Sequence, residues 1–177
     1  MISSLTEIQA QLYGDIQMPN HCHNRVTIWS QDEATIENLK NLFEDENIFT
    51  QIIPEPDWLN TPLMSSDMPK YDWDKAKGKV GELPQYVDTP YGKSLRFKST
   101  GIADDRWYDW RVQNWDTKWD AYDVQVDGGF DDDELTIEFN TAWSPPEAIC
   151  HALREKYPEA TVSWFYDEPG CELAGYL

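Results

Sequence analysis

The sequence predicts a single α+β domain whose elements follow the order strand, helix, strand, strand, helix, strand. Several short segments alternate apolar and polar residues, as strands with one buried face do, and longer segments repeat apolar residues at helical spacing. The chain has 177 residues, of which 40% are hydrophobic, and this is enough for one domain with its own core.

The first predicted strand contains Val26 and Ile28, which alternate with polar residues. A helix should follow it, because Ser30 and Glu33 have the spacing of a capping box. The residues after this box form one apolar helical face, made by Ile36, Leu39, Leu42 and Phe43.

Two segments are expected to lie outside this regular pattern. Residues 1–17 have apolar residues at helical spacing and predict a short N-terminal helical extension, so the domain itself should span residues 18–177. Residues 54–103 are rich in Pro, Gly, Ser and Lys and predict an insertion with small elements of its own, including a hairpin around YGKSLRF.

A tryptophan-rich helix is predicted after the insertion, in DDRWYDWRVQNW, with Asp104 as its cap. Arg111 lies four residues from both Trp107 and Trp115, a spacing that favours cation–π stacking on one helix face.

The rest of the chain completes the pattern. Two alternating segments flank Gly128 and predict a hairpin, and SPPE predicts a helix with Ser144 as its cap and Pro145 in its first turn. ATVSWFY predicts another strand, and CELAGYL predicts a further edge strand. This order is that of a ferredoxin-like βαββαβ fold, an antiparallel sheet with two helices on one face.

Charge limits the classes of partner. The net charge is −19, so the surface should repel nucleic acid, and we expect no direct duplex binding. Residues 70–98 are an exception, because seven Lys or Arg stand there against four acids. The remaining residues carry −22 and suit a partner with a basic surface.

Hydropathy and cysteine usage predict a cytoplasmic protein. No apolar run reaches the roughly 20 residues of a membrane helix, and the N-terminus does not have the pattern of a signal peptide. Cys22, Cys150 and Cys171 are too few and too scattered for a disulfide framework, so we expect free thiols.

Two patterns resemble metal sites. Asp123, Gln125, Asp127, Gly128, Asp131 and Glu134 match an EF-hand loop, but both flanking segments alternate with a period of two, and an acidic hairpin tip is favoured. His21 and His23 share a predicted strand face with Cys22 between them, but a zinc site also needs distant ligands such as Cys150, His151 or Cys171. No metal, cofactor or catalytic residue is therefore predicted.

The stretch NWDTKWDAY leaves two interpretations open. Asn114, Trp115, Lys118, Trp119 and Asp120 would form a small polar pocket in which Lys118 holds an anion or Asp120 acts as acid or base. The favoured interpretation is that the tryptophans cover the edge of the sheet and Lys118 pairs with a carboxylate.

Four segments resemble the YubB-like ferredoxin-fold family of phage and plasmid proteins: MPNHCHNRVTI, WYDWRVQNWDTKWDA, FNTAWSPP and YPEATVSWFYDEPGCELAG. Asp116 departs from this resemblance, because the family usually has Gly there. The resemblance implies a ferredoxin-like fold and carriage on mobile elements, and it implies no activity.

Three functions compete. The first is a non-enzymatic inhibitor of a host defence protein, an anti-CRISPR or anti-restriction nucleic-acid decoy that binds a basic surface through Asp104, Asp105, Asp109, Asp131, Asp132, Asp133 and Glu134. The second is a single-stranded nucleic-acid binder that uses the basic insertion. The third is a small-ligand or enzymatic site at NWDTKW.

Overall fold

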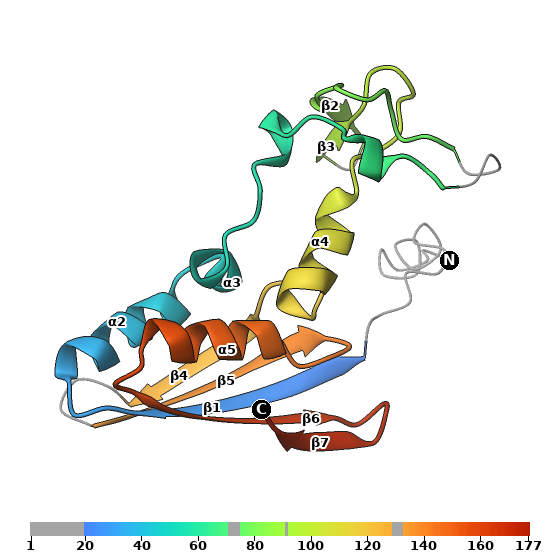
Figure 1. Ribbon diagram of the computed structural model, residues 1–177. Helices are drawn as coiled ribbons and strands as arrows, with labels where there is room; N and C mark the ends of the chain where they lie inside the picture. The colour runs from blue at the N-terminus through green and yellow to red at the C-terminus, as the bar shows by residue number, and fades with distance from the viewer. Residues whose placement is uncertain (1–19, 71–74, 91, 129–132) are drawn as a thin grey trace, which may run out of the picture.

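The computed structural model describes residues 20–70, 75–90, 92–128 and 133–177 (Figure 1). Five strands form one antiparallel sheet in the order β4-β5-β1-β6-β7. They are β1 (His21–Trp29), β4 (Tyr122–Gly128), β5 (Glu134–Ala142), β6 (Thr161–Glu168) and β7 (Leu173–Tyr176).

The α-helices of the described chain lie on one face of this sheet (Figure 1). They are α2 (Glu33–Glu44), α3 (Ile48–Ile52), α4 (Arg106–Trp115) and α5 (Glu147–Lys156). The expectation of an α+β domain with an antiparallel sheet is confirmed. The expectation of two helices on this face is too low. The predicted tryptophan-rich helix, α4, lies on the same side of the sheet as α2 and α5, and α3 was not predicted.

The core lies between the sheet and its helices. Alternate residues of β1, β5 and β6 point into it, and Val26, Ile137 and Trp164 are fully buried. Ile36, Leu39 and other residues of the predicted α2 face, and Ile149 and Leu153 of α5, close the core from the helix side. The opposite face of the sheet therefore carries the polar half of each alternating strand.

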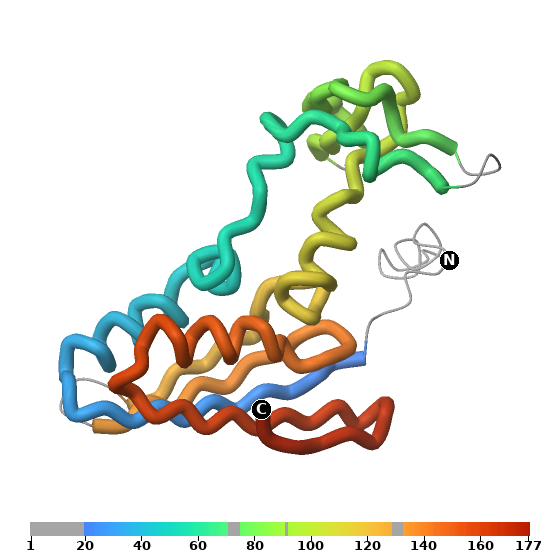
Figure 2. Tube along the Cα trace, viewed as in Figure 1, coloured from blue at the N-terminus to red at the C-terminus, as the bar shows by residue number. Residues whose placement is uncertain are grey.

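The insertion is a separate structure that stands away from the sheet (Figure 2). It contains two short 3₁₀ helices, η1 (Trp58–Asn60) and η2 (Ser65–Asp67), and the hairpin of β2 (Gln85–Thr89) and β3 (Gly92–Arg96). The hairpin predicted around YGKSLRF is thus confirmed. Leu63 and Phe97 are fully buried and give this segment a small core of its own.

Three predicted helix caps are wrong, because each side chain has another partner. The Ser30 hydroxyl accepts a hydrogen bond from the Asp32 amide, and α2 begins after Asp32. The Ser144 hydroxyl donates to the carbonyl of Asp116, and α5 begins after Pro146. Asp104 accepts the Arg106 amide at 3.2 Å, so it does bond the first amide of α4, but it mainly forms a buried ion pair with the Arg106 side chain, and Asp105 stands at the cap position.

Three further predictions concern the N-terminal extension, the cysteines and membrane-spanning helices. Residues 1–17 lie outside the described residues, so the N-terminal helical extension stays a prediction. Cys22, Cys150 and Cys171 are free thiols. No helix in the described ranges combines the length and the hydropathy that crossing a membrane requires.

Candidate functional site: the open face of the sheet

Three of the quoted segments meet at one end of the sheet. The Thr117 hydroxyl donates to the carbonyl of Ala142 at 3.0 Å and accepts from its amide at 3.2 Å. The Trp143 amide donates to the carbonyl of Asn20 at 2.9 Å. NWDTKW therefore joins α4 to the end of β5, and the residue after β5 joins the chain just before β1.

The five residues of the predicted NWDTKW pocket do not line one cavity. Trp115 is fully buried, and its indole nitrogen donates to the carbonyl of Ile53 at 3.1 Å. The Asn114 amide group donates to the carbonyl of Trp110 within the same helix. Trp119 is 36% exposed at the surface.

Lys118 does not pair with a carboxylate among the described residues, which contradicts the favoured interpretation of its role. Its ammonium lies 4.3 Å from the ring centre of Trp119 and 5.6 Å from that of Trp143. The lysine charge is therefore held by two exposed indole rings.

The two carboxylates of the stretch hold the first turns of helices. Asp116 has a φ of 63°, and its Oδ2 accepts the Ala148 amide of α5 at 2.8 Å. Asp120 Oδ1 accepts the Phe49 amide of α3 at 3.0 Å. Acceptors at helix N-termini satisfy amides that have no partner within the helix, so both residues have structural roles.

Asp120 should make stability depend on pH. Burial raises the pKa of this half-buried carboxyl above 3.8, against the opposing effects of the Phe49, Ala121 and Thr50 amides and of Arg111. Between 3.8 and the raised pKa, the folded state binds more protons than the unfolded state, so the free energy of unfolding falls as pH rises. Asp120→Asn keeps an acceptor and removes this loss, and its stability relative to wild type should rise with pH in that window.

Denaturant unfolding across a pH series measures this difference. Asp120→Ala is the control, because it also lacks the titrating carboxyl but leaves the Phe49 amide without its acceptor, and it should be about 1 to 2 kcal/mol less stable than Asp120→Asn at every pH. Parallel pH profiles for wild type and Asp120→Asn would contradict the assignment.

The acids predicted to bind a partner lie in different environments. Asp104 is not available, because its side chain is 1% exposed and pairs with Arg106 at 2.8 Å. Asp105 pairs with Lys77 at 2.5 Å, and Asp109 is exposed on α4. Asp133 and Glu134 are exposed at the start of β5, and Asp131 and Asp132 lie outside the described residues.

The face of the sheet opposite the helices is strongly acidic, and we call it the open face. No described helix covers it (Figure 1). Strand register brings six carboxylates and one arginine onto it or its rim: Asp123, Asp127, Asp133, Glu134, Glu138, Asp167 and Arg25. Arg25 Nη2 lies 2.5 Å from Glu138, so its charge is already neutralised.

A hollow of about 390 Å³ lies in the middle of the open face. One row across it consists of Asp123, Asn140, His23 and Asp167, on four strands. The Asn140 Nδ2 donates to Asp123 at 3.2 Å, so its Oδ1 must accept from His23 Nδ1, 2.6 Å away. Neutral His23 therefore keeps its proton on Nδ1, and Nε2 is an acceptor.

Acceptors are thus concentrated in this central hollow. The Asp167 carboxylate has no hydrogen bond or ion pair with any residue in the described ranges. The ring of Phe165 lies beside it on β6 and meets Tyr176 at 5.3 Å. The hollow offers acceptors and ring edges to a group rich in N–H donors.

A second hollow, of about 440 Å³, lies at the end of the face near the predicted acidic hairpin tip. Trp29, which is 42% exposed, lines it together with Asp127, Asp133 and Glu134. An indole ring beside carboxylates attracts cations.

In the part of the chain that the structure describes, no group of three or more His, Cys, Asp and Glu side chains could hold a metal ion. The described part of the EF-hand pattern falls on strands, residues 123–128 on β4 and Glu134 on β5, and Asp131 lies outside the described residues. His21 Nδ1 lies 2.7 Å from the Tyr122 hydroxyl, and Cys22 is buried.

Comparison with known proteins supports the fold class. Residues 114–177 match a family model described as the ferredoxin-like domain in Api92-like protein. This part of the chain is similar to a ferredoxin-like domain. The match begins at α4, yet β1 lies between β5 and β6, so residues 21–29 complete the same sheet.

The chain also resembles the crystal structure of a protein api92 from Yersinia pseudotuberculosis, with a TM-score of 0.49 and 9% sequence identity. That similarity covers 89% of this chain and 93% of that chain. No curated protein matches the sequence.

Sequence reasoning missed the carboxylates at the centre of the open face as a group. Asp123, Asp127, Glu138 and Asp167 stand at polar positions of alternating strands, which is a signal that the sequence does contain. Their grouping depends on which strands are neighbours, and the local alternation of residues does not predict the order of strands in the sheet.

Proposed function

We propose that this chain is a non-enzymatic binding protein that holds a basic surface of another protein against its open face. One observation carries the proposal: the uncovered face presents six carboxylates against one arginine, which Glu138 already neutralises. Opposite charge speeds the encounter of two proteins and selects among partners.

Exposed aromatic side chains on the same face would supply contact area. Trp29 is 42% exposed and Tyr176 is 73% exposed. Phe165 lines the central hollow and contacts the ring of Tyr176. Aromatic anchors surrounded by charge are typical of protein interfaces, whereas a phosphate backbone would be repelled by this face.

We further propose that the partner is a nucleic-acid-handling protein of a host cell, since such proteins carry basic surfaces of this kind. The chain would then act in the cytoplasm as a decoy inhibitor of an anti-CRISPR or anti-restriction type, which suits the carriage on mobile elements that its resemblance to the YubB-like phage and plasmid family implies. In this proposal β1, α2, β4, β5, α5 and β6 form a βαββαβ core, and β7 is an added edge strand.

The basic insertion gives little support to the alternative function, binding of single-stranded nucleic acid, because some of its basic side chains have structural roles. Lys77 is paired with Asp105, and Arg96 Nη1 donates to the carbonyl of Gly101 at 2.8 Å. Two of the seven basic residues of segment 70–98 therefore already have partners within the chain.

A charge-matched pair of variants tests the proposal. The open-face variant combines Asp127→Asn, Glu134→Gln and Asp167→Asn, and the control combines Glu37→Gln, Glu46→Gln and Glu155→Gln, three exposed carboxylates away from the open face. Each tagged protein is used to capture partners from host lysate under increasing salt, and the affinity for the purified partner is then measured.

The open-face variant should bind roughly tenfold to a hundredfold more weakly, and with a shallower salt dependence, than wild type. The control variant has the same net charge and should bind like wild type. Equal losses in the two variants, or a partner whose affinity does not respond to salt, would overturn the proposal.

A further inference from the structure

An aromatic cleft of about 670 Å³ lies between the insertion and the core helices, away from the open face. Four rings from four different segments line it: Trp58 of η1, Tyr86 of β2, Trp107 of α4 and Trp119 beyond the end of α4. Leu59 and Leu95 add apolar surface. Its volume lies within the usual range for ligand sites.

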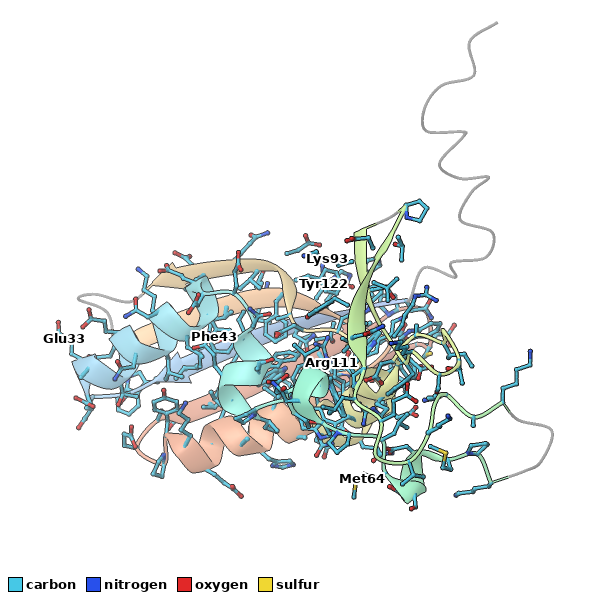
Figure 3. The ribbon with its side chains drawn as sticks, turned by 90° about the horizontal axis from the view of Figure 1, so that it is seen from above. Glu33, Phe43, Met64, Lys93, Arg111 and Tyr122 are labelled. Atoms are coloured by element: carbon cyan, nitrogen blue, oxygen red, sulfur yellow. The ribbon has the colours of Figure 1, made fainter. Side chains whose placement is uncertain are left out.

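Two of the charged groups that line the cleft, Arg111 and Glu55, are paired with each other. Arg111 Nε and Nη2 both donate to Glu55 Oε2, at 3.0 and 2.6 Å, and the Trp58 indole nitrogen donates to Glu55 Oε1 at 2.6 Å. The Arg111 guanidinium lies over the rings of Trp107 and Trp115, at 5.2 and 4.7 Å. Figure 3 labels Arg111 between the core helices and the insertion.

Three aromatic side chains of the lining carry hydrogen-bond donors without a partner among the described residues. The indole N–H groups of Trp107 and Trp119 and the hydroxyl of Tyr86 donate to no residue in the described ranges. Asp57, a carboxylate of the lining, already accepts from the Leu59 amide at 3.1 Å and from Asn60 at 2.7 Å. A well-matched ligand therefore offers carbonyl acceptors and few donors.

We propose that the aromatic cleft binds a proline-rich, extended segment of a partner protein. Proline has no backbone N–H, so such a segment presents carbonyl acceptors and flat rings without donors that would go unpaired. Its extended conformation is preformed, and aromatic grooves with ring N–H and O–H donors recognise it in this way.

Charge adds a second requirement. Glu55 and Asp57 stand against Arg111 alone, so the lining has an excess of one negative charge. A basic residue next to the prolines would complement this excess. The site does not depend on the open face.

The test uses two synthetic peptides. The first has one arginine followed by eight residues in which every second residue is proline, and the second has the same charge with alanine in place of each proline. Binding is followed by NMR signals of the tryptophan indole N–H groups and by calorimetry. The proline peptide should shift a subset of the indole signals, and the alanine peptide should bind at least tenfold more weakly.

Variants locate the site. Tyr86 is 60% exposed, so Tyr86→Ala should preserve the fold and weaken the proline peptide at least about fivefold, the usual threshold for an interface anchor. Tyr176→Ala, on the open face, and the open-face variant should bind the peptide like wild type. Equal affinity for both peptides, equal losses in Tyr86→Ala and Tyr176→Ala, or indole shifts with a neutral oligosaccharide alone would overturn the assignment.

Discussion

The Arg106→Ala variant should lose about 3 to 5 kcal/mol of stability in the insertion, because it leaves Asp104 as a buried charge without a partner. Arg106 Nε and Nη2 donate to the two Asp104 oxygens at 2.9 and 2.8 Å. Its guanidinium also donates to the carbonyls of Thr61 and Pro62 and lies over the rings of Trp58 and Phe97. One side chain therefore connects residues 58–62 and Phe97 of the insertion to Asp104, just before α4.

Amide hydrogen exchange measures this loss where it should occur. The amides of Phe97, Gly101 and Asp104 are bonded within the insertion and should lose protection in Arg106→Ala. Arg25→Ala breaks an ion pair whose side chains are 64% and 47% exposed, and this control should cost under about 1 kcal/mol. Unchanged protection of the three amides in Arg106→Ala would contradict the assigned role.

The Trp115→Ala variant should lose about 3 to 5 kcal/mol of global stability, as large aromatic truncations in cores do. Trp115 is fully buried and meets Phe49 and Trp110 edge-on, at 5.8 and 5.7 Å between ring centres. Its indole also anchors the segment after α3 through the carbonyl of Ile53. The first tryptophan of NWDTKW is therefore a core residue.

The second tryptophan of the motif is the matched control for the first. Trp119 is 36% exposed, so Trp119→Ala should cost about 1 kcal/mol or less. Chemical denaturation of the two variants gives the comparison. Losses of equal size would show that the structure assigns burial wrongly to these two residues.

Local patterns predicted most of the fold. Alternation found β1, β4, β5, β6 and β7, and helical spacing found α2, α4 and α5. The predicted stacking of Arg111 on Trp107 and Trp115 is present, because residues four apart on a helix are neighbours whatever packs around them.

Features that depend on distant residues could not be predicted locally. Helix α3 has five residues, too few for a periodic signal, and its Phe49 amide is held by Asp120 from 71 positions away. The local sequence predicts Asp104 as an exposed acid, whereas in the fold its side chain is buried and paired with Arg106. The open face likewise exists only once β1 lies between β5 and β6.

The most direct measurement of the central claim is hydroxyl-radical footprinting of the chain with its captured, purified partner. Trp29, Phe165 and Tyr176 line the open face, and the account predicts that their oxidation falls sharply in the complex. Tyr108, which is 44% exposed on α4, should react equally in both states. Full reactivity of the three open-face rings in a saturated complex would contradict the account.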